Sequence, residues 1–308
     1  MISLRYKDKG TAVHRLNPFH KLLWVISIFV LALILDHPVY ILLLFLATLP
    51  AVAAAKVWRE WASVIKLALY LCLAIIIINT FVSYHGSTTL WQAGFRLPLI
   101  GTPIITLESI FFGMGMSLRL LAIISAFAVL TFTIHPDDIM LAIIKLKLPY
   151  KSVLVTSLST KFVPTLIEDV QRISDVQRSR GLELDRGGLI QRIKSRTAII
   201  IPLLSNSLDR TVQVAEAMES RAFGSGQKRS FYKEITLSRL DVTALTVSFL
   251  PIVLGICMRY WGYGIYQYYP TLERLSIDRL EGSMLFLLVF LLGIIVPFAL
   301  LKKRIELN

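Results

Sequence analysis

Long runs of apolar residues constrain this chain more than any other feature of its sequence. A helix needs roughly 20 apolar residues to cross the hydrocarbon core of a bilayer. Runs of this kind cover approximately residues 22–35, 39–55, 67–83, 109–134, 242–258 and 284–301. Of all residues, 55% are hydrophobic and 17% are charged, compared with roughly 25% charged residues in soluble domains. We therefore expect an all-α, polytopic membrane protein with about six transmembrane helices.

The basic residues predict the orientation of these helices, because the cytoplasmic loops of membrane proteins carry an excess of Lys and Arg. The N-terminal arm contains one acidic residue, Asp8, and five basic residues, which are Arg5, Lys7, Lys9, Arg15 and Lys21. With six spans, this arm and the C-terminal residues 301–308 both face the cytoplasm in a cell membrane. Cytoplasmic loops and contacts with membrane lipid then explain the net charge of +13. We expect no nucleic-acid partner.

The first apolar run is short for a perpendicular span, so we expect a tilted or shallow hairpin with the second run. Its N-terminal flank lacks the order of a signal peptide, and the run is expected to remain in the mature protein. Cys72 and Cys257 lie within apolar runs, which predicts small buried side chains rather than a disulfide.

Motifs for nucleotides, metals and cofactors are not evident. The chain contains no P-loop, no zinc-protease motif and no aspartate-rich metal motif. The stretch from His135 to Asp138 contains two aspartates, but acidic residues in the first turn of an interfacial helix explain it better than a metal site does. We expect no metal site and no cofactor.

A polar segment divides the chain into an N-terminal transmembrane part, residues 1–144, a cytoplasmic segment, residues 145–240, and a C-terminal transmembrane part, residues 241–308. Its apolar residues recur at spacings of three and four, which predicts two long amphipathic helices. Pro164 and Pro202 each lie near the predicted start of one helix. The apolar positions are Val163, Leu166, Val170 and Ile173 in the first helix, and Ile201, Leu204, Leu208, Val212, Ala215 and Met218 in the second.

Both predicted helices end in a similar basic motif, Ser179-Arg180-Gly181 in the first and Ser220-Arg221-Ala222 in the second. One interpretation is capping, because a cation is favoured at the C-terminus of a helix and glycine commonly ends one. The other is docking, because an exposed guanidinium offers a planar fork to a carboxylate of another protein. Since Ala222 disfavours a positive φ, we expect Gly224 to end the second helix.

Arg119 lies in the middle of the fourth apolar run, where an ionisable residue is costly and therefore a candidate functional residue. Its partner can be Glu108, a lipid headgroup or a carboxylate of a partner subunit. The alternative is an arginine that is satisfied within the chain and fixes packing. Small residues just before it, in the stretch 113–116, allow close approach of another helix.

At the two motifs the sequence resembles the T component, the transmembrane coupling subunit of energy-coupling factor transporters. Members of that family carry two short Ala-Arg-Gly-type motifs, each at the end of a long cytoplasmic coupling helix. The stretches "NPFHKLL", "MSLRLLAIISAFAVLTFTIHPDDIMLAI" and "LKLPYKSVLVTSLSTKFVPTLIEDVQRISDVQRSRG" also resemble the family. The resemblance covers roughly residues 15–255. This chain departs from the pattern in having Ser for the first Ala of each motif and Ala for the last Gly of the second.

The resemblance implies a function for both motifs. Arg180 and Arg221 would each dock in a groove of one of two ABC ATP-binding subunits, and the membrane helices would pack against a separate substrate-binding membrane subunit (S subunit). The chain would be a non-catalytic subunit that transmits ATP-driven motion during the uptake of a vitamin or a transition-metal ion.

Two other functions remain open from the residues alone. An integral membrane enzyme with an active site at the cytoplasmic face would use the Asp and Arg residues of the polar segment. A self-contained permease or channel would need polar residues along several spans. Apart from Asn79 and Arg119, few such residues are present.

Overall fold

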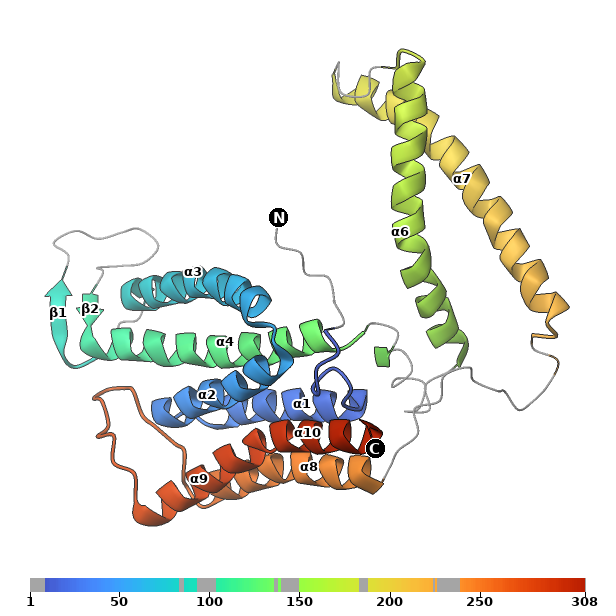
Figure 1. Cartoon of the computed structure of the whole chain (residues 1–308). Coiled ribbons are helices and arrows are strands. Elements are labelled where there is room, and N and C mark those ends of the chain that lie inside the picture. Colours follow the sequence, from blue (N-terminus) through green and yellow to red (C-terminus); the bar gives the residue numbers. More distant parts are fainter. Residues whose placement is uncertain are drawn as a thin grey trace. The chain divides into compact units, whose positions relative to one another are not determined.

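The computed structural model describes residues 9–82, 86–92, 104–135, 138–139, 150–182, 188–223, 225 and 239–307. The chain forms two compact units (Figure 1). The membrane unit comprises Met1–Ile139 and Thr236–Asn308, and the α6–α7 unit comprises Met140–Ile235. Each unit is described separately below.

The membrane unit is helical, with one small β-hairpin among its described residues. Five helical segments are long and apolar enough to cross a membrane, and α1, with 17 residues, is a shorter apolar helix. The predicted all-α polytopic fold is therefore confirmed, and the last apolar run consists of two helices that meet at Ile294. The elements are α1 (Pro18–Ile34), α2 (Pro38–Ala55), α3 (Trp58–Val82), β1 (Thr89–Gln92), β2 (Ile104–Thr106), α4 (Leu107–Thr133), α8 (Arg239–Tyr260), α9 (Arg279–Gly293) and α10 (Ile295–Leu307).

Helix α1 lies at the centre of this unit, between α4 and α8 (Figure 1). Its residues Ile28, Leu31 and Ala32 are fully buried. The indole Nε1 of Trp24 donates to the carbonyl of Leu292 in α9 at 2.9 Å. Because its apolar side chains face protein on several sides, α1 is held by packing although it is short for a span.

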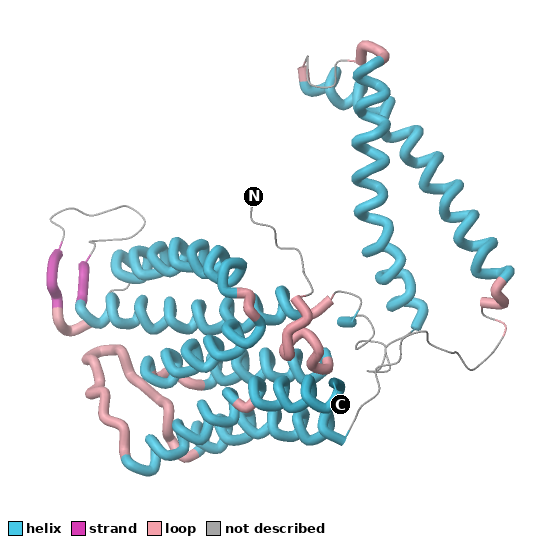
Figure 2. Tube along the Cα trace, in the orientation of Figure 1, coloured by secondary structure: helices cyan, strands magenta, loops and turns pink. Residues whose placement is uncertain are grey.

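Helices α1 and α2 each begin with a proline, Pro18 and Pro38. Proline suits the first turn of a helix because its missing N–H would have no intrahelical partner there. At α1 the side chain of Asn17 also accepts a hydrogen bond from the N–H of Phe19 at 3.1 Å. In the turn between the two helices, the N–H groups of Asp36 and His37 donate to the carbonyl of Gly264, at 2.9 and 3.1 Å. The loop after α8, the longest described loop in Figure 2, therefore holds the α1–α2 turn.

Helices α3 and α4 pack closely through small residues. A Cβ at Gly113 would lie 3.1 Å from the Cα of Ile76. Ser117 and Cys72 exchange hydrogen bonds with each other's backbone carbonyls across the same interface. The small-residue stretch therefore packs against α3, as the sequence predicts. Cys72 is buried and Cys257 partly buried, and both are free thiols.

The α6–α7 unit consists of two long helices, α6 (Tyr150–Ser179) and α7 (Leu189–Ser220). They are joined by an ion pair of 3.0 Å between Arg210 Nη2 and Asp169 Oδ2. The amide of Gln177 also donates to the carbonyl of Ala198, at 3.4 Å. The two predicted amphipathic helices are present.

The prolines of this unit lie inside the helices, not near their starts, so that prediction is wrong. Each helix begins well before its proline, Pro164 in α6 and Pro202 in α7. Proline inside a helix removes one backbone hydrogen bond and disturbs the preceding turn. The remaining turns of these long helices retain their bonds, so both helices continue through the proline.

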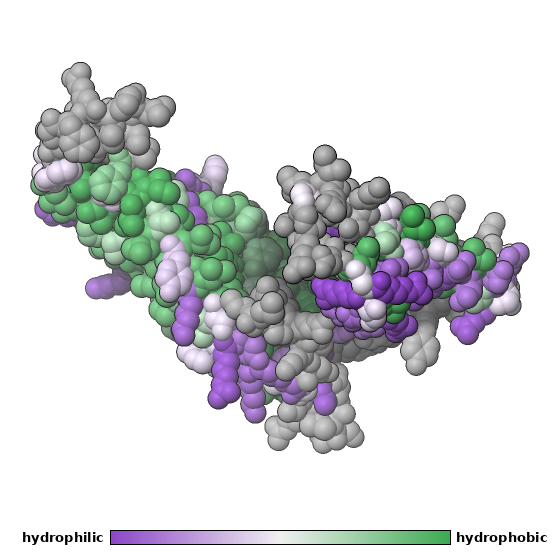
Figure 3. Space-filling model, turned by 90° about the horizontal axis from the view of Figure 1, so that it is seen from above, coloured by the Kyte–Doolittle hydropathy of each residue, from purple (hydrophilic) through white to green (hydrophobic). Residues whose placement is uncertain are grey.

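The apolar face of α7 is exposed in this chain, since Ile201, Leu204, Leu208 and Val212 keep between 55% and 63% of their surface accessible. Figure 3 shows the contrast between the two units: the surface of the membrane unit is mostly hydrophobic, whereas hydrophilic and hydrophobic residues alternate over α6 and α7. A face of this kind is typical of helices that contact a partner or a membrane.

Candidate functional site

The first motif forms the end of α6. Ser179 is the last helical residue, and Gly181 has a φ of 84°. The N–H of Gly181 donates to the carbonyl of Arg178, and the N–H of Leu182 donates to that of Gln177, both at 3.0 Å. These two bonds define a Schellman cap, which satisfies carbonyls that the end of a helix leaves free.

The second motif ends α7 in the same way. Ser220 is the last helical residue, the N–H of Ala222 donates to Glu219 at 2.8 Å, and the N–H of Phe223 donates to Met218 at 2.9 Å. Ala222 itself has a φ of 57°, so the prediction that it would not adopt a positive φ is wrong. The two hydrogen bonds of the cap offset the steric cost of that conformation. Gly224, the predicted alternative, lies outside the described residues.

Both motif serines donate within their own helix. The hydroxyl of Ser179 donates to the carbonyl of Asp175 at 2.9 Å, and that of Ser220 to the carbonyl of Ala217 at 3.0 Å. Such bonds are common where serine replaces alanine at an exposed helix position. Both serine hydroxyls are therefore satisfied within their own helix.

Both motif arginines occupy the position between the last helical residue and the residue with positive φ. Arg180 and Arg221 are exposed. Among the described residues, neither guanidinium makes a hydrogen bond or an ion pair with another side chain, whereas neighbouring Arg178 lies 4.0 Å from the carboxylate of Asp175. Each guanidinium gains only the favourable field of the helix end. Its planar set of donors remains available for a carboxylate of another protein.

The two helix ends lie apart. Figure 1 shows α6 and α7 crossing near the C-terminal end of α6, after which α7 runs back along the opposite direction. The hydrogen bond between Gln177 and Ala198 lies near this crossing. The pair therefore presents two separate arginine-bearing ends.

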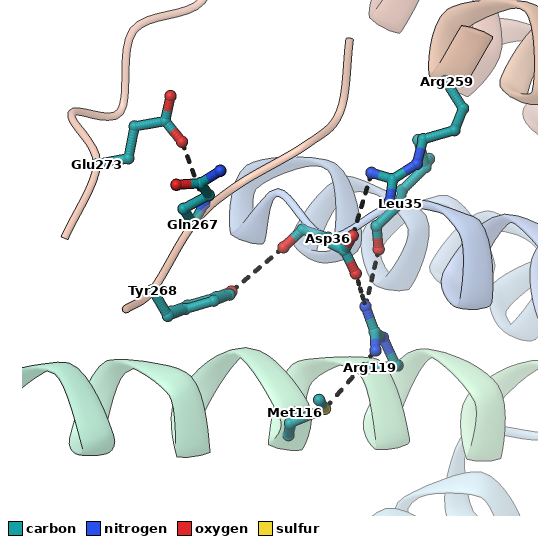
Figure 4. Close-up of polar contacts among 8 residues, drawn as sticks. All are labelled: Leu35, Asp36, Met116, Arg119, Arg259, Gln267, Tyr268 and Glu273. Atoms are coloured by element: carbon teal, nitrogen blue, oxygen red, sulfur yellow. Dashed lines mark hydrogen bonds and ion pairs between the residues drawn. The ribbon is translucent and has the colours of Figure 1, made fainter. Parts of the chain in front are cut away.

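Arg119 belongs to a different cluster, in the membrane unit (Figure 4). Its Nη2 lies 2.8 Å from Oδ1 of Asp36 and 3.0 Å from the carbonyl of Leu35. The other oxygen of Asp36 lies 3.1 Å from Nη1 of Arg259, at the end of α8. Arg119 is therefore paired within the chain, and the interpretation that it pairs with Glu108 is wrong. Glu108 instead accepts hydrogen bonds from Ser87 and Thr88.

The loop after α8 completes this cluster. The hydroxyl of Tyr268 donates to the carbonyl of Asp36 at 3.3 Å, and burial raises the pKa of that phenol to about 12. The phenol therefore remains a donor at ordinary pH. A cavity of about 140 Å³ adjoins the cluster and is lined by Asp36, Ile41, Phe112, Gly115, Met116, Arg119, Tyr266 and Tyr268.

Asp36, Arg259 and Tyr268 were not among the residues selected from the sequence. Each lies more than eighty residues from Arg119 or at a helix end, where charged and aromatic residues are common. One sequence feature does point to Asp36. Only a short connection joins the first two apolar runs, so its carboxylate must lie close to the membrane, where a charged group is costly.

Comparison with known proteins agrees with the membrane fold. The family model described as "Cobalt transport protein" (CbiQ) matches residues 9–232, a range that contains both motifs. The energy-coupling factor transporter transmembrane protein EcfT of Streptococcus equi subsp. equi is 30% identical over 261 residues, covering 82% of this chain and 93% of the relative.

Two further relatives carry the same name. The protein of Streptococcus thermophilus is 30% identical over 266 residues, covering 83% of this chain and 96% of the relative. The protein of Acidaminococcus fermentans is 29% identical over 268 residues, covering 84% and 96%. The chain therefore belongs to the cobalt transport protein family, whose curated relatives are transmembrane proteins of energy-coupling factor transporters.

Proposed function

We propose that this chain is the coupling subunit of an energy-coupling factor importer, and that Arg180 and Arg221 are its docking points for two ABC ATPase subunits. The observation that carries the proposal is the pair of helix caps with the same backbone geometry. Each cap presents one exposed arginine without a side-chain partner among the described residues. Two equivalent ends suit two equivalent partners.

The contact is expected to be an arginine–carboxylate pair. A guanidinium on a helix end is held by a rigid backbone, so little conformational freedom is lost when it enters a groove lined by carboxylates. Residues 179–181 and 220–222 would then form the two contact sites. In this proposal residues 145–240 lie in the cytoplasm together with both chain termini, where the ATPase subunits have access to ATP.

Movement of the ATPase subunits would change the angle between α6 and α7. The Asp169–Arg210 ion pair and the Gln177–Ala198 hydrogen bond join the two helices, so displacement of one helix end pulls on the other helix. The membrane unit would transmit this motion to a separate substrate-binding membrane subunit. The substrate would be a vitamin or a transition-metal ion, and the chain itself would catalyse no reaction.

The test is the double variant Arg180→Glu with Arg221→Glu, expressed together with the ATPase subunits encoded by the same organism. Charge reversal places a carboxylate against the proposed carboxylate, so the ATPase subunits should be lost from the purified complex while the variant remains in the membrane. The matched control is Arg178→Glu with Arg196→Glu. It makes the same charge change at exposed positions of the same two helices and should retain the ATPase subunits.

Retention of a full complement of ATPase subunits by the double motif variant would contradict the docking proposal. Equal loss from the control variant would show that net charge, rather than the motifs, governs assembly. Catalytic turnover by the purified single chain would instead indicate a membrane enzyme.

A further inference from the structure

Two helices of the membrane unit connect it to the α6–α7 unit. The chain passes from α4 (Leu107–Thr133) into that unit and returns from it into α8 (Arg239–Tyr260). If a displacement of α6 and α7 is transmitted along the chain, it enters the membrane unit at α4 and α8. How firmly these two helices are tied together decides whether the displacement moves the whole unit or only tilts each helix separately.

Helix α1 separates α4 from α8 and bonds to both near its N-terminal end. The buried ammonium of Lys21 donates to the carbonyl of Thr133, the last residue of α4, at 2.7 Å. On its other side, the imidazole of His20 lies 2.8 Å from the hydroxyl of Ser248 in α8. Ser27 also donates to the carbonyl of Ser248, at 2.8 Å.

At the opposite end of α1 a single carboxylate joins the same two helices. Asp36 follows α1 directly and pairs through one oxygen with Arg119 of α4 and through the other with Arg259 of α8 (Figure 4). Among the described residues, neither guanidinium forms an ion pair with any other carboxylate. The side chain of Arg119 is 18% exposed, that of Asp36 34% and that of Arg259 38%, so water competes less for the Asp36–Arg119 ion pair than for the Asp36–Arg259 ion pair.

The position of Asp36 is itself fixed by the backbone. Its N–H donates to Gly264 and its carbonyl accepts from Tyr268. The close approach of Tyr268 depends on Gly115, where a Cβ would clash with the phenolic oxygen. Because this carboxylate pairs with a cation on each helix, a displacement of α4 or α8 is opposed by its ion pair with the other helix.

We propose that Asp36 is a positioning residue that ties α4 to α8, so that displacement of the α6–α7 unit moves the membrane unit as one body. Without the carboxylate, the two guanidinium groups repel each other and α4 and α8 tilt separately. The coupling part of this inference rests on the proposed function, whereas the tie between the two helices does not.

The first experiment uses the chain alone in lipid nanodiscs. Spin labels at Met114 in α4 and Ile256 in α8, both half-exposed, report the distance between the two helices, with Cys72 and Cys257 replaced by serine. Asp36→Asn should broaden the distance distribution, and Asp36→Glu should restore most of the original width. The matched control is Glu273→Gln, which removes a carboxylate that accepts a hydrogen bond from the backbone N–H of Gln267 in the loop after α8 and, among the described residues, forms no ion pair with α4 or α8. An unchanged distribution in Asp36→Asn would overturn the proposal.

The second experiment uses the complete transporter in proteoliposomes. Asp36→Asn should leave assembly and ATP hydrolysis unchanged and reduce substrate uptake about tenfold. In this variant α4 and α8 would tilt separately, so the displacement of α6 and α7 would no longer move the whole membrane unit. A purely structural role would lower assembly, hydrolysis and uptake together, and that outcome would overturn the positioning role. Unchanged uptake with a broadened distance distribution would also overturn the positioning role. If the wild-type chain bound no ATPase subunits, the proposed function would fail, and the nanodisc distances would still decide whether Asp36 ties the two helices.

Discussion

Gly181 and Ala222 occupy the same position at the ends of two different helices, with φ angles of 84° and 57°. In both cases the preceding residue is the motif arginine, and the following residue donates a hydrogen bond back into the last helical turn. An alanine in the left-handed region is uncommon, because its Cβ approaches a carbonyl oxygen. The two helix ends therefore have the same cap geometry despite the different residue.

This geometry predicts opposite effects for two exchanges. Ala222→Gly should stabilise the end of α7 by about 1 kcal/mol, and Gly181→Ala should destabilise the end of α6 by about the same amount. Hydrogen–deuterium exchange of the last-turn amides measures both. If Ala222→Gly decreased protection, the assignment of a strained cap would be contradicted.

The ion pair between Asp169 and Arg210 should stabilise the crossing of α6 and α7. The Asp169 side chain is 12% exposed and that of Arg210 is 34% exposed, so we expect a coupling energy of about 1 kcal/mol, between the values for exposed and buried pairs. A double-mutant cycle with both residues changed to alanine measures it, using hydrogen exchange of the flanking turns as readout. Additive effects of the two single substitutions would show that the pair contributes nothing.

Close packing of α3 on α4 predicts a strong effect at Gly113. Because a Cβ there meets the backbone of Ile76 at 3.1 Å, Gly113→Val should lower the stability of the membrane unit by about 1–3 kcal/mol. Thermal unfolding in detergent checks this result. Gly293→Ala is the control, since nothing lies within 4 Å of its Cβ position, and a similar loss of stability there would argue against a specific contact at Gly113.

His37 predicts a pH dependence of stability. It is 4% exposed, neither ring nitrogen has a hydrogen-bond partner among the described residues, and its ring lies edge-on to those of Tyr40 and Tyr266. Burial lowers the pKa of His37 below its ordinary value of 6.5, and the carboxylates of Glu281 and Glu273 offset part of that effect.

The direction in which stability changes with pH follows from the difference between the pKa of His37 in the folded and in the unfolded chain. Above pH 6.5 His37 is neutral in both the folded and the unfolded state and costs nothing. Below that value the unfolded chain takes up a proton first, so stability is lost as the pH falls toward the lower pKa of the folded state. Unfolding temperatures measured between about pH 8 and pH 5 should decrease less in His37→Phe than in the wild type. The exposed His135→Gln variant should retain the full decrease, and a wild-type profile without any decrease would contradict the prediction.

The features that depend on local periodicity could be predicted from the sequence. The apolar runs predict the membrane helices because length and hydrophobicity alone decide whether a helix crosses a bilayer. The spacing of Ile201, Leu204, Leu208 and Val212 predicts α7 for a similar reason. The two Ser-Arg motifs could also be recognised, because each stands at the end of such a pattern.

The features that depend on tertiary contacts could not be predicted from the sequence. Arg119 pairs with Asp36, 83 residues earlier in the chain, while the candidate on its own helix, Glu108, is bound by the loop before β1. The packing of α1 between α4 and α8, together with the loop after α8, brings Asp36 to Arg119. Residue preference argues against the positive φ of Ala222, whereas the hydrogen bonds to the last helical turn stabilise it.

The most direct test of the account is a cross-linking measurement at the two helix ends. A photoreactive phenylalanine analogue in place of Ser179 or Ser220 leaves both arginines intact and reports what lies beside them in the assembled transporter. We predict that each position forms a covalent adduct with an ATPase subunit, and that charge reversal of the neighbouring arginine abolishes the adduct at that position. Adducts with lipid or with this chain alone, and none with an ATPase subunit, would contradict the central claim.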